Sequence, residues 1–180
     1  MVNYKDIIYE IIETEGGLVD NPHDLGGITK YGVTIKSLST YWGRQATRED
    51  IINLDKRTAF NVFEKLYYRN PKIDKFKDDF IQYIVLDMAV NHGSSNAVRM
   101  LQETINNTKL FNPIKVDGLI GPQTIKRTNN CYCLMARYFT NMLCDRRERF
   151  YRNIVKHNSS QQVFLNGWLN RNNKFRTELP

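Results

Sequence analysis

The sequence predicts a mainly helical fold with one small β-hairpin near the N-terminus and a helical module at the C-terminus. Apolar residues recur at helical spacing through most of the 180 residues. Five of the ten glycines fall within residues 15–34, which interrupts the helical pattern and favours tight turns. A second interruption at residues 106–116 divides the chain, so we expect two regions, 1–105 and 106–180, that pack on each other.

The first expected element is an amphipathic helix. Its apolar positions follow the i, i+3, i+4, i+7, i+8 pattern of a helix that lies on a core: Tyr4, Ile7, Ile8, Ile11 and Ile12. Asn3 is the expected N-cap, and Gly16-Gly17 is expected to end the helix. Glu15 then lies in the last turn, where the negative end of the helix dipole disfavours a carboxylate. We therefore expect this acid to keep its proton near neutral pH.

A hairpin is expected directly after this helix. Asn21-Pro22 and Leu25-Gly26-Gly27 are turn signals on either side of Asp24, and they should carry Asp24 and Thr29 back toward the helix end. Glu15, Asp24 and Thr29 would then line one wall. A protonated acid that faces an ionised carboxylate is the arrangement used to hydrolyse glycosidic bonds, and a nearby hydroxyl can hold a water.

The middle of the chain predicts further helices. Thr47 to Asp50 resembles a capping box with Asp in the last position, and Asp55 is the expected cap of the next helix. A helix break is expected at Gly93, with a new helix starting at Ser94 or Ser95. The expected buried positions are Ala59, Phe60, Phe63, Leu66, Tyr67, Ile81, Ile84, Val85, Met88, Ala89, Val98, Leu101 and Ile105.

The C-terminal region also reads as helices. Pro122 is expected at the first position of a helix, where its missing N–H costs nothing. Residues 131–157 are expected to form one long helix. The cysteines in this region, Cys131, Cys133 and Cys144, lack the spacing of a zinc site, so we expect small buried residues or free thiols and no metal.

The net charge of +7, from 26 Lys and Arg against 19 Asp and Glu, indicates an anionic partner. The densest basic cluster, residues 146–152, contains acidic residues at helical spacing, so we expect a solvated helix face and no nucleic acid. Anionic wall polymers or outer-membrane lipids are the alternative partners. Neither an apolar run of 18 residues nor a secretion signal is evident. We therefore expect the chain in a host cytoplasm until it is released to the periplasm or cell wall.

Several motifs together resemble a known family. Glu15-Gly16-Gly17, followed by the stretch from Asn21 to Thr34, resembles the signature of glycoside hydrolase family 108, the N-acetylmuramidases found mostly as phage endolysins. Further matching stretches lie along nearly the whole chain: Asp87 to Gly93, Leu101-Gln102, Val116 to Thr124 and Phe164 to Arg171. Within them, Asp117 to Pro122 is similar to a motif of helical peptidoglycan-binding modules.

The resemblance implies a lysozyme-like fold and hydrolysis of the β-1,4 bond between N-acetylmuramic acid and N-acetylglucosamine, without a cofactor. It places the catalytic acid at Glu15. Asp24 and Thr29 acquire catalytic roles by a looser similarity to the Glu, Asp, Thr triad of phage lysozymes, with one residue fewer between Asp and Thr. A phage-encoded enzyme of this kind would be a monomer that needs a holin for export.

We expect Tyr31, Asn91 and Trp168 to contact the substrate, although Trp168 is equally suited to anchor the C-terminal tail in the core. Two other functions stay open: a lytic transglycosylase, which uses one acid and closes an anhydro ring, and a cell-wall-binding protein without catalysis. The stereochemical outcome also stays open, because it depends on the separation of the two carboxyl groups.

Overall fold

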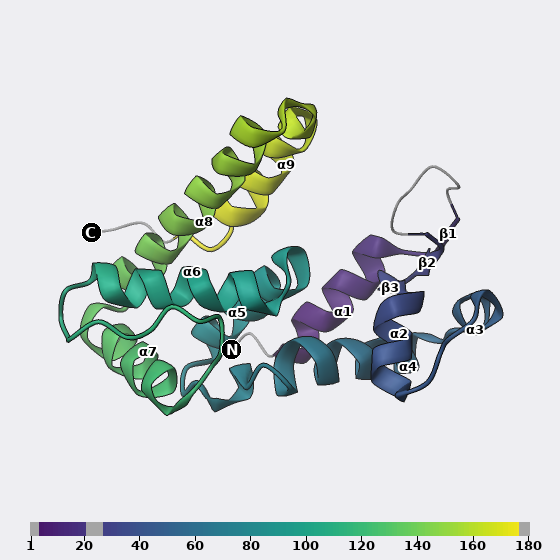
Figure 1. Ribbon diagram of the computed structural model, residues 1–180, viewed down its shortest axis with the longest axis horizontal. Helices are drawn as coiled ribbons and strands as arrows, with labels where there is room; N and C mark the ends of the chain where they lie inside the picture. Colours follow the sequence, from purple (N-terminus) through teal and green to yellow (C-terminus); the bar gives the residue numbers. More distant parts are fainter. Residues whose placement is uncertain (1–3, 21–26, 177–180) are drawn as a thin grey trace. The chain divides into compact units, whose positions relative to one another are not determined.

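The computed structural model of the protein describes residues 4–20 and 27–176, and at Glu15 the backbone alone. The chain divides into two compact units, residues 1–75 and 76–180. Helices dominate both units, and the first also holds a small antiparallel sheet (Figure 1), which confirms the predicted fold class. The module boundary expected at residue 106 falls inside a helix of the second unit, α6 (Ser94–Asn107), and stays a prediction.

The first helix, α1 (Tyr4–Glu15), forms as predicted. Its side chains Ile7, Ile8, Ile11 and Ile12 are all buried. Gly16 then adopts a φ of 63°, and its N–H donates to the carbonyl of Ile12 over 3.1 Å, which closes the helix. The expected N-cap Asn3 lies outside the described residues.

The rest of the first unit contains α2 (Ile35–Trp42), α3 (Arg48–Ile52), α4 (Lys56–Phe63), η1 (Glu64–Arg69) and η2 (Ile73–Lys75). Both predicted caps are confirmed. The Thr47 hydroxyl accepts from the Asp50 N–H while the Asp50 carboxylate accepts from the Thr47 N–H, and Asp55 accepts from the Thr58 N–H over 2.6 Å.

The segment η1 is a π-helical turn, which the sequence pattern did not predict. Its wider turn brings every fifth residue onto one face, so the buried residue after Phe63 is Tyr68, and the predicted positions Leu66 and Tyr67 are only half-buried. The ring of Tyr68 stacks on that of Tyr4, with centroids 4.2 Å apart. The start of α1 is therefore held by the π-helical turn.

The second unit contains α5 (Asp79–His92), α6 (Ser94–Asn107), α7 (Pro122–Met135), α8 (Arg137–His157), η3 (Ser159–Gln161) and α9 (Gln162–Asn173). Helix α6 packs on α5, and α8 contacts α6, α7 and α9 (Figure 1). The stripes predicted on α5 and α6 are buried, which confirms both helices and the break at Gly93. In the described part of the chain, no helix is long and apolar enough to cross a membrane.

The single helix expected over residues 131–157 is wrong, because α7 ends at Met135 and α8 begins at Arg137. Between them, Ala136 has φ 42° and ψ −110°. A straight helix would continue the buried position of Cys131 through Tyr138, yet Tyr138 is exposed and Phe139 is buried. The break at Ala136 turns the apolar face of α8 toward α6 and α9.

The loop before α7 is fixed by the side chain of Gln102. Its amide nitrogen donates to Asp117 Oδ1 and to the carbonyl of Leu119, and its amide oxygen accepts from the Gly118 N–H over 2.9 Å. Gly118 has a φ of 78°, and a Cβ at this position would lie 2.5 Å from Ser95 Oγ. This loop therefore requires glycine for both conformation and space.

We predict that Gly118→Ala lowers the free energy of unfolding by about 2 kcal/mol, since it combines a left-handed conformation with a steric clash. Gly167→Ala is the matched control, because Gly167 lies within α9 and has open space around it. This control should raise the free energy of unfolding by about 0.5–1 kcal/mol. Urea unfolding followed by circular dichroism measures both, and equal effects of the two substitutions would contradict the assigned role of Gly118.

Candidate active site and a buried charge network

The stretch after α1 forms a three-stranded antiparallel sheet of β1 (Leu18–Val19), β2 (Thr29–Lys30) and β3 (Val33–Thr34). The hairpin expected between β1 and β2 is present, and a second hairpin that sequence analysis missed follows it. Its two turn residues, Tyr31 and Gly32, have φ values of 56° and 73°. Two successive positive φ angles define the tight turn preferred in two-residue hairpins.

A backbone hydrogen bond joins this sheet to the end of α1. The N–H of Tyr31 donates to the carbonyl of Gly16, the residue after Glu15, over 3.1 Å. The β2–β3 turn is thereby held against the C-terminal end of the helix. The three predicted site residues of the first unit that the structure describes in whole or in part, Glu15, Thr29 and Tyr31, lie on this joined framework.

The two faces of the sheet have different surroundings. Val33 is buried, and its partner on β2, Lys30, donates from Nζ to the carbonyl of Ile52 over 2.6 Å. Since neighbouring residues of a strand point to opposite faces, Thr29 lies on the other face, where it is half-buried. The hydroxyl of Thr29 is thus on the face that the core does not use.

Asp24 and the turn residues around it lie outside the described residues 4–20 and 27–176. The predicted position of Asp24 opposite Glu15 stays a prediction. Next to that segment, Arg48 on α3 forms an ion pair with Asp20. Arg48 and Lys30 are basic residues beside the sheet that sequence analysis did not identify, because each occupies a variable position of its motif.

The last turn of α1 contains no basic residue. Glu13 forms an ion pair with Lys56 over 2.6 Å, and the hydrogen bond that Lys56 Nζ donates to the Glu13 carboxylate raises the pKa of Lys56. Both side chains are more than half exposed, so this pair adds little stability. Glu13 is therefore a solvated carboxyl group on the same helix as Glu15.

The two predicted contact residues of the second unit have separate environments. Asn91 is exposed, and its side-chain amide donates to the carbonyl of Asp87 within α5 over 2.8 Å. Trp168 is half-buried and stacks on Tyr151 and Phe164, with ring centroids 5.2 and 5.9 Å away. Their proposed contacts with substrate stay predictions.

The motif that contains Asp87 forms a buried charge network. Asp87 pairs with Arg147 of α8 over 2.6 Å, and Arg147 has no exposed side-chain surface. The second oxygen of Asp87 accepts from Arg171 Nε of α9 over 2.8 Å. Arg147 also donates to His92 Nε2 over 3.3 Å. These motif residues thus join α5, α8 and α9.

His92 also contacts Tyr151 in this network. Its Nε2 lies 3.1 Å from the Tyr151 hydroxyl. Burial lowers the pKa of His92 to about 3, and the neighbouring charge of Arg147 acts in the same direction. The imidazole is therefore neutral at physiological pH and can accept a hydrogen bond. A protonated His92 would place a second cation beside the buried Arg147.

The remaining titratable residue type singled out from the sequence is cysteine. Cys131 and Cys144 are buried free thiols, and Cys133 is an exposed one. Burial raises the pKa of the Cys144 thiol to about 11. These two buried residues therefore behave as small core side chains, as one of the two sequence interpretations predicted.

Comparisons with known proteins find two family matches, which meet between residues 93 and 96 and not at the unit boundary after residue 75. Residues 8–93 match the family described as glycosyl hydrolase 108, and residues 96–173 match the one described as a predicted peptidoglycan domain. The solved structure of Brucella abortus SagA is similar over 96% of this chain and 91% of that chain, with 27% identity and a TM-score of 0.77. No curated protein sequence matches. The family matches confirm the resemblance inferred from the motifs.

We predict that His92 makes stability depend on pH. Because the folded pKa, about 3, lies below the ordinary value of 6.5, the unfolded chain binds this proton first on acidification. The contribution of neutral His92 is fully present above pH 6.5 and is lost as pH falls toward 3. Between these limits, His92→Gln should remove a slope of up to about 1.4 kcal/mol per pH unit from the free energy of unfolding.

The matched control is His157→Gln, since His157 is exposed at the end of α8. Urea unfolding of the wild type and both variants at pH 4 to 7.5 gives the three slopes. A wild-type slope in the His92→Gln protein would show that His92 does not titrate as the network requires.

Proposed function

Since residues 8–93 match the family described as glycosyl hydrolase 108, we propose that the protein cleaves the β-1,4 bond between N-acetylmuramic acid and N-acetylglucosamine. It is a peptidoglycan hydrolase of this type, with a peptidoglycan domain at residues 96–173. The observation that carries the proposal is the position of Glu15. It is the last residue of α1, and the next residue is bonded to the β2–β3 turn.

Glu15 is the general acid in this proposal. Its backbone lies in the last turn of α1, four residues after Ile11 and three after Ile12. The negative C-terminal end of the helix dipole favours the protonated form. Glu15 would give its proton to the glycosidic oxygen as the bond to the anomeric carbon breaks.

Asp24 and Thr29 complete the proposed chemistry. Asp24 stabilises the positive charge that develops on the sugar ring, or acts as the base toward a water that Thr29 holds. The position of Thr29 on the outer face of the sheet supports this role, because its hydroxyl is not needed by the core. A carboxyl separation of about 5–5.5 Å would give retention of configuration, and one of about 6.5–9.5 Å would give inversion.

Substrate contacts are proposed for each unit separately. Tyr31 presents a half-buried ring at the turn that is bonded to Gly16, with Lys30 Nζ 5.5 Å from the ring centroid. In the second unit, Asn91 offers an amide and Trp168 an aromatic ring. Aromatic faces suit the apolar face of a pyranose, and the amide can bond to an acetamido group.

The biological setting we propose is that of a phage endolysin. A monomer would accumulate in the host cytoplasm, pass a membrane opened by a holin, and act on the wall. The net charge of +7 supports an attraction to anionic wall polymers or outer-membrane lipids.

The test is mass spectrometry of the fragments released from purified peptidoglycan. The wild type should release chains with a hydrated N-acetylmuramic acid at the reducing end, and Glu15→Gln should be slower by about 10² to 10⁴-fold. Glu13→Gln is the matched control, since Glu13 is a solvated acid on the same helix. Anhydro ends would instead identify a transglycosylase, and the absence of sugar fragments would identify a binding protein without catalysis.

A second prediction concerns Thr29. Replacing it by valine keeps the shape and the strand preference but removes the hydroxyl, so kcat should fall by about 10²-fold while the unfolding midpoint stays close to that of the wild type. Thr29→Ser retains the hydroxyl and should keep most of the activity. If Thr29→Val is as active as Thr29→Ser, then the hydroxyl does not hold the reacting water.

A further inference from the structure

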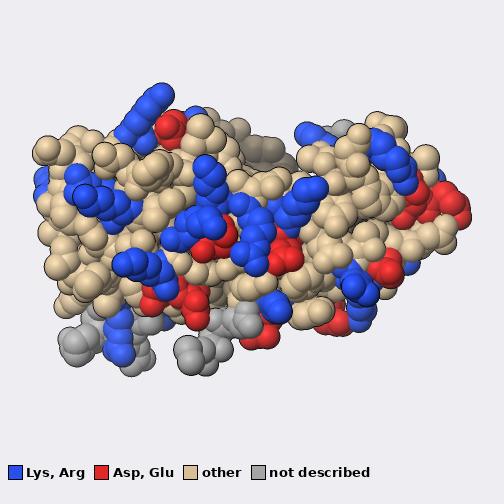
Figure 2. All heavy atoms as spheres, turned by 90° about the horizontal axis from the view of Figure 1, so that it is seen from below, with Lys and Arg blue, Asp and Glu red and all other residues tan. Residues whose placement is uncertain are grey.

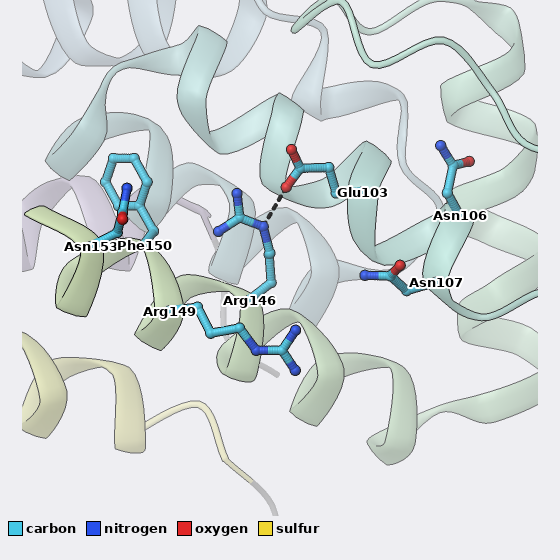
Figure 3. Close-up of a pocket in the computed structure, with 7 residues that line it drawn as sticks. All are labelled: Glu103, Asn106, Asn107, Arg146, Arg149, Phe150 and Asn153. Carbon is cyan, nitrogen blue, oxygen red and sulfur yellow. Dashed lines mark hydrogen bonds and ion pairs between the residues drawn. The ribbon is translucent and has the colours of Figure 1, made fainter.

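The second unit carries an open groove between α6 and α8 that the proposed catalytic residues do not line. Its volume is about 600 Å³, and a neighbouring hollow of about 260 Å³ shares Asn107, Arg146 and Arg149 with it. Helical spacing of i, i+3 and i+4 puts the lining residues of each helix on one face. These residues are Glu103, Asn106 and Asn107 of α6, and Arg146, Arg149, Phe150 and Asn153 of α8 (Figure 3).

Three of these side chains are already engaged by the protein. Arg146 reaches across the groove and pairs with Glu103 (Figure 3). Asn106 donates to the carbonyl of Ile114 over 2.9 Å and accepts from the Ile114 N–H over 2.8 Å. They build the wall of the groove and hold the loop that follows α6.

The other polar groups are available to a ligand. Arg149 and Asn107 are exposed, and, within the described residues, no partner satisfies the side chains of Arg149, Asn107 or Asn153. Since Arg146 and Glu103 neutralise each other, Arg149 leaves the groove with one positive charge. Phe150 lies beside these groups, and its ring packs against the His92 ring, with the two ring centroids 5.2 Å apart.

We infer that this groove binds the peptide-bearing glycan of peptidoglycan, with Arg149 pairing with a carboxylate of the stem peptide. The ligand class rests on the proposed function and on the match of residues 96–173 to a peptidoglycan domain. A guanidinium binds a carboxylate through two parallel hydrogen bonds. Asn107 and Asn153 can bond to peptide or acetamido groups, and the Phe150 ring suits the apolar face of a sugar.

The residues that line the groove make a nucleic acid an unsuitable ligand for it. A phosphate backbone requires several unpaired cations along a track, whereas the described lining residues offer Arg149 and place the Glu103 carboxylate in the same groove. Figure 2 shows a face on which Lys and Arg are likewise intermixed with Asp and Glu. One cation among amides and an aromatic ring fits a glycopeptide better.

The experiment measures co-sedimentation with insoluble peptidoglycan, using the Glu15→Gln chain so that the wall is not digested. In this background, Arg149→Glu should weaken binding by about tenfold and Arg149→Gln by a smaller factor. Arg152→Gln is the matched control, because Arg152 is exposed on the same helix and is paired with Glu148. It should bind within about twofold of the parent chain.

A second arm identifies the group that Arg149 contacts. Soluble peptide-bearing glycan strands should displace the parent chain from the insoluble wall at about tenfold lower concentration than strands from which an amidase has removed the stem peptides. Against Arg149→Glu, the two kinds of strand should compete equally, since the contact is already lost. The inference is overturned if Arg149→Glu binds like the parent chain, if Arg152→Gln weakens binding equally, or if peptide removal weakens competition against both chains by the same factor.

Product release by the chain with native Glu15 separates this inference from the proposed hydrolysis. If that chain releases no sugar fragments and wall binding still depends on Arg149, the hydrolysis proposal is wrong and the inference about the groove is upheld. If fragment release depends on Glu15 but wall binding does not depend on Arg149, only the inference about the groove is wrong. Unchanged thermal unfolding midpoints of the Arg149 variants, expected for an exposed residue, tie a loss of binding to the groove itself.

Discussion

The ion pair between Asp87 and Arg147 is the interaction on which the second unit depends. Both groups are almost completely removed from water, and their separation is 2.6 Å. Such a pair repays its desolvation only when further partners satisfy both charges, and loss of one partner typically costs about 3–5 kcal/mol. Here Arg171 donates to the second oxygen of Asp87 and His92 accepts from Arg147 Nε, while Arg147 Nη1 has no hydrogen-bond partner among the described residues. Asp87 is thus a reason why α5, α8 and α9 occupy fixed positions.

The same pair determines which face α8 presents to the surface. Arg147 points inward and lies over the rings of Tyr151 and Phe175, with its guanidinium carbon 5.5 and 5.7 Å from the centroids. Its neighbour Arg146 therefore faces α6, and Arg149 follows one turn later on the same side. A buried charge on one side of the helix fixes the polar groove on the other. Asp87 and Arg171 belong to motifs that resemble a hydrolase family, yet their observed contacts position helices.

In the first unit, backbone conformation has the equivalent role. Gly16 ends α1 with a positive φ, and its carbonyl accepts the bond from Tyr31. The sheet has strands of only two residues, so side-chain packing across it is slight. The arrangement of Glu15 and Thr29 consequently relies on turns that few residue types can form, which explains why glycines are concentrated in this part of the sequence.

Most of the helices were predictable, because their apolar stripes and caps are local signals: α1, α5 and α6 lie where periodicity put them, and Thr47 and Asp55 cap as expected. The break at Ala136 and the π-helical turn were not, since tertiary packing imposes both on sequences compatible with an α-helix. In the site, Glu15 and Thr29 lie on the elements predicted for them. The contacts of Lys30 and Arg48 and the α6–α8 groove could not be predicted, because they form between segments that are distant in the sequence.

The π-helical turn η1 also constrains the length of the chain. It accommodates one residue more than an α-helical turn would, and Tyr68 reaches Tyr4 only because of that residue. Deleting a single residue between Glu64 and Arg69 would restore a regular helix and rotate Tyr68 by about 100° around the axis, away from its partner. The loops of the first unit should therefore tolerate insertions and deletions better than this helical segment, where a change of length displaces core side chains.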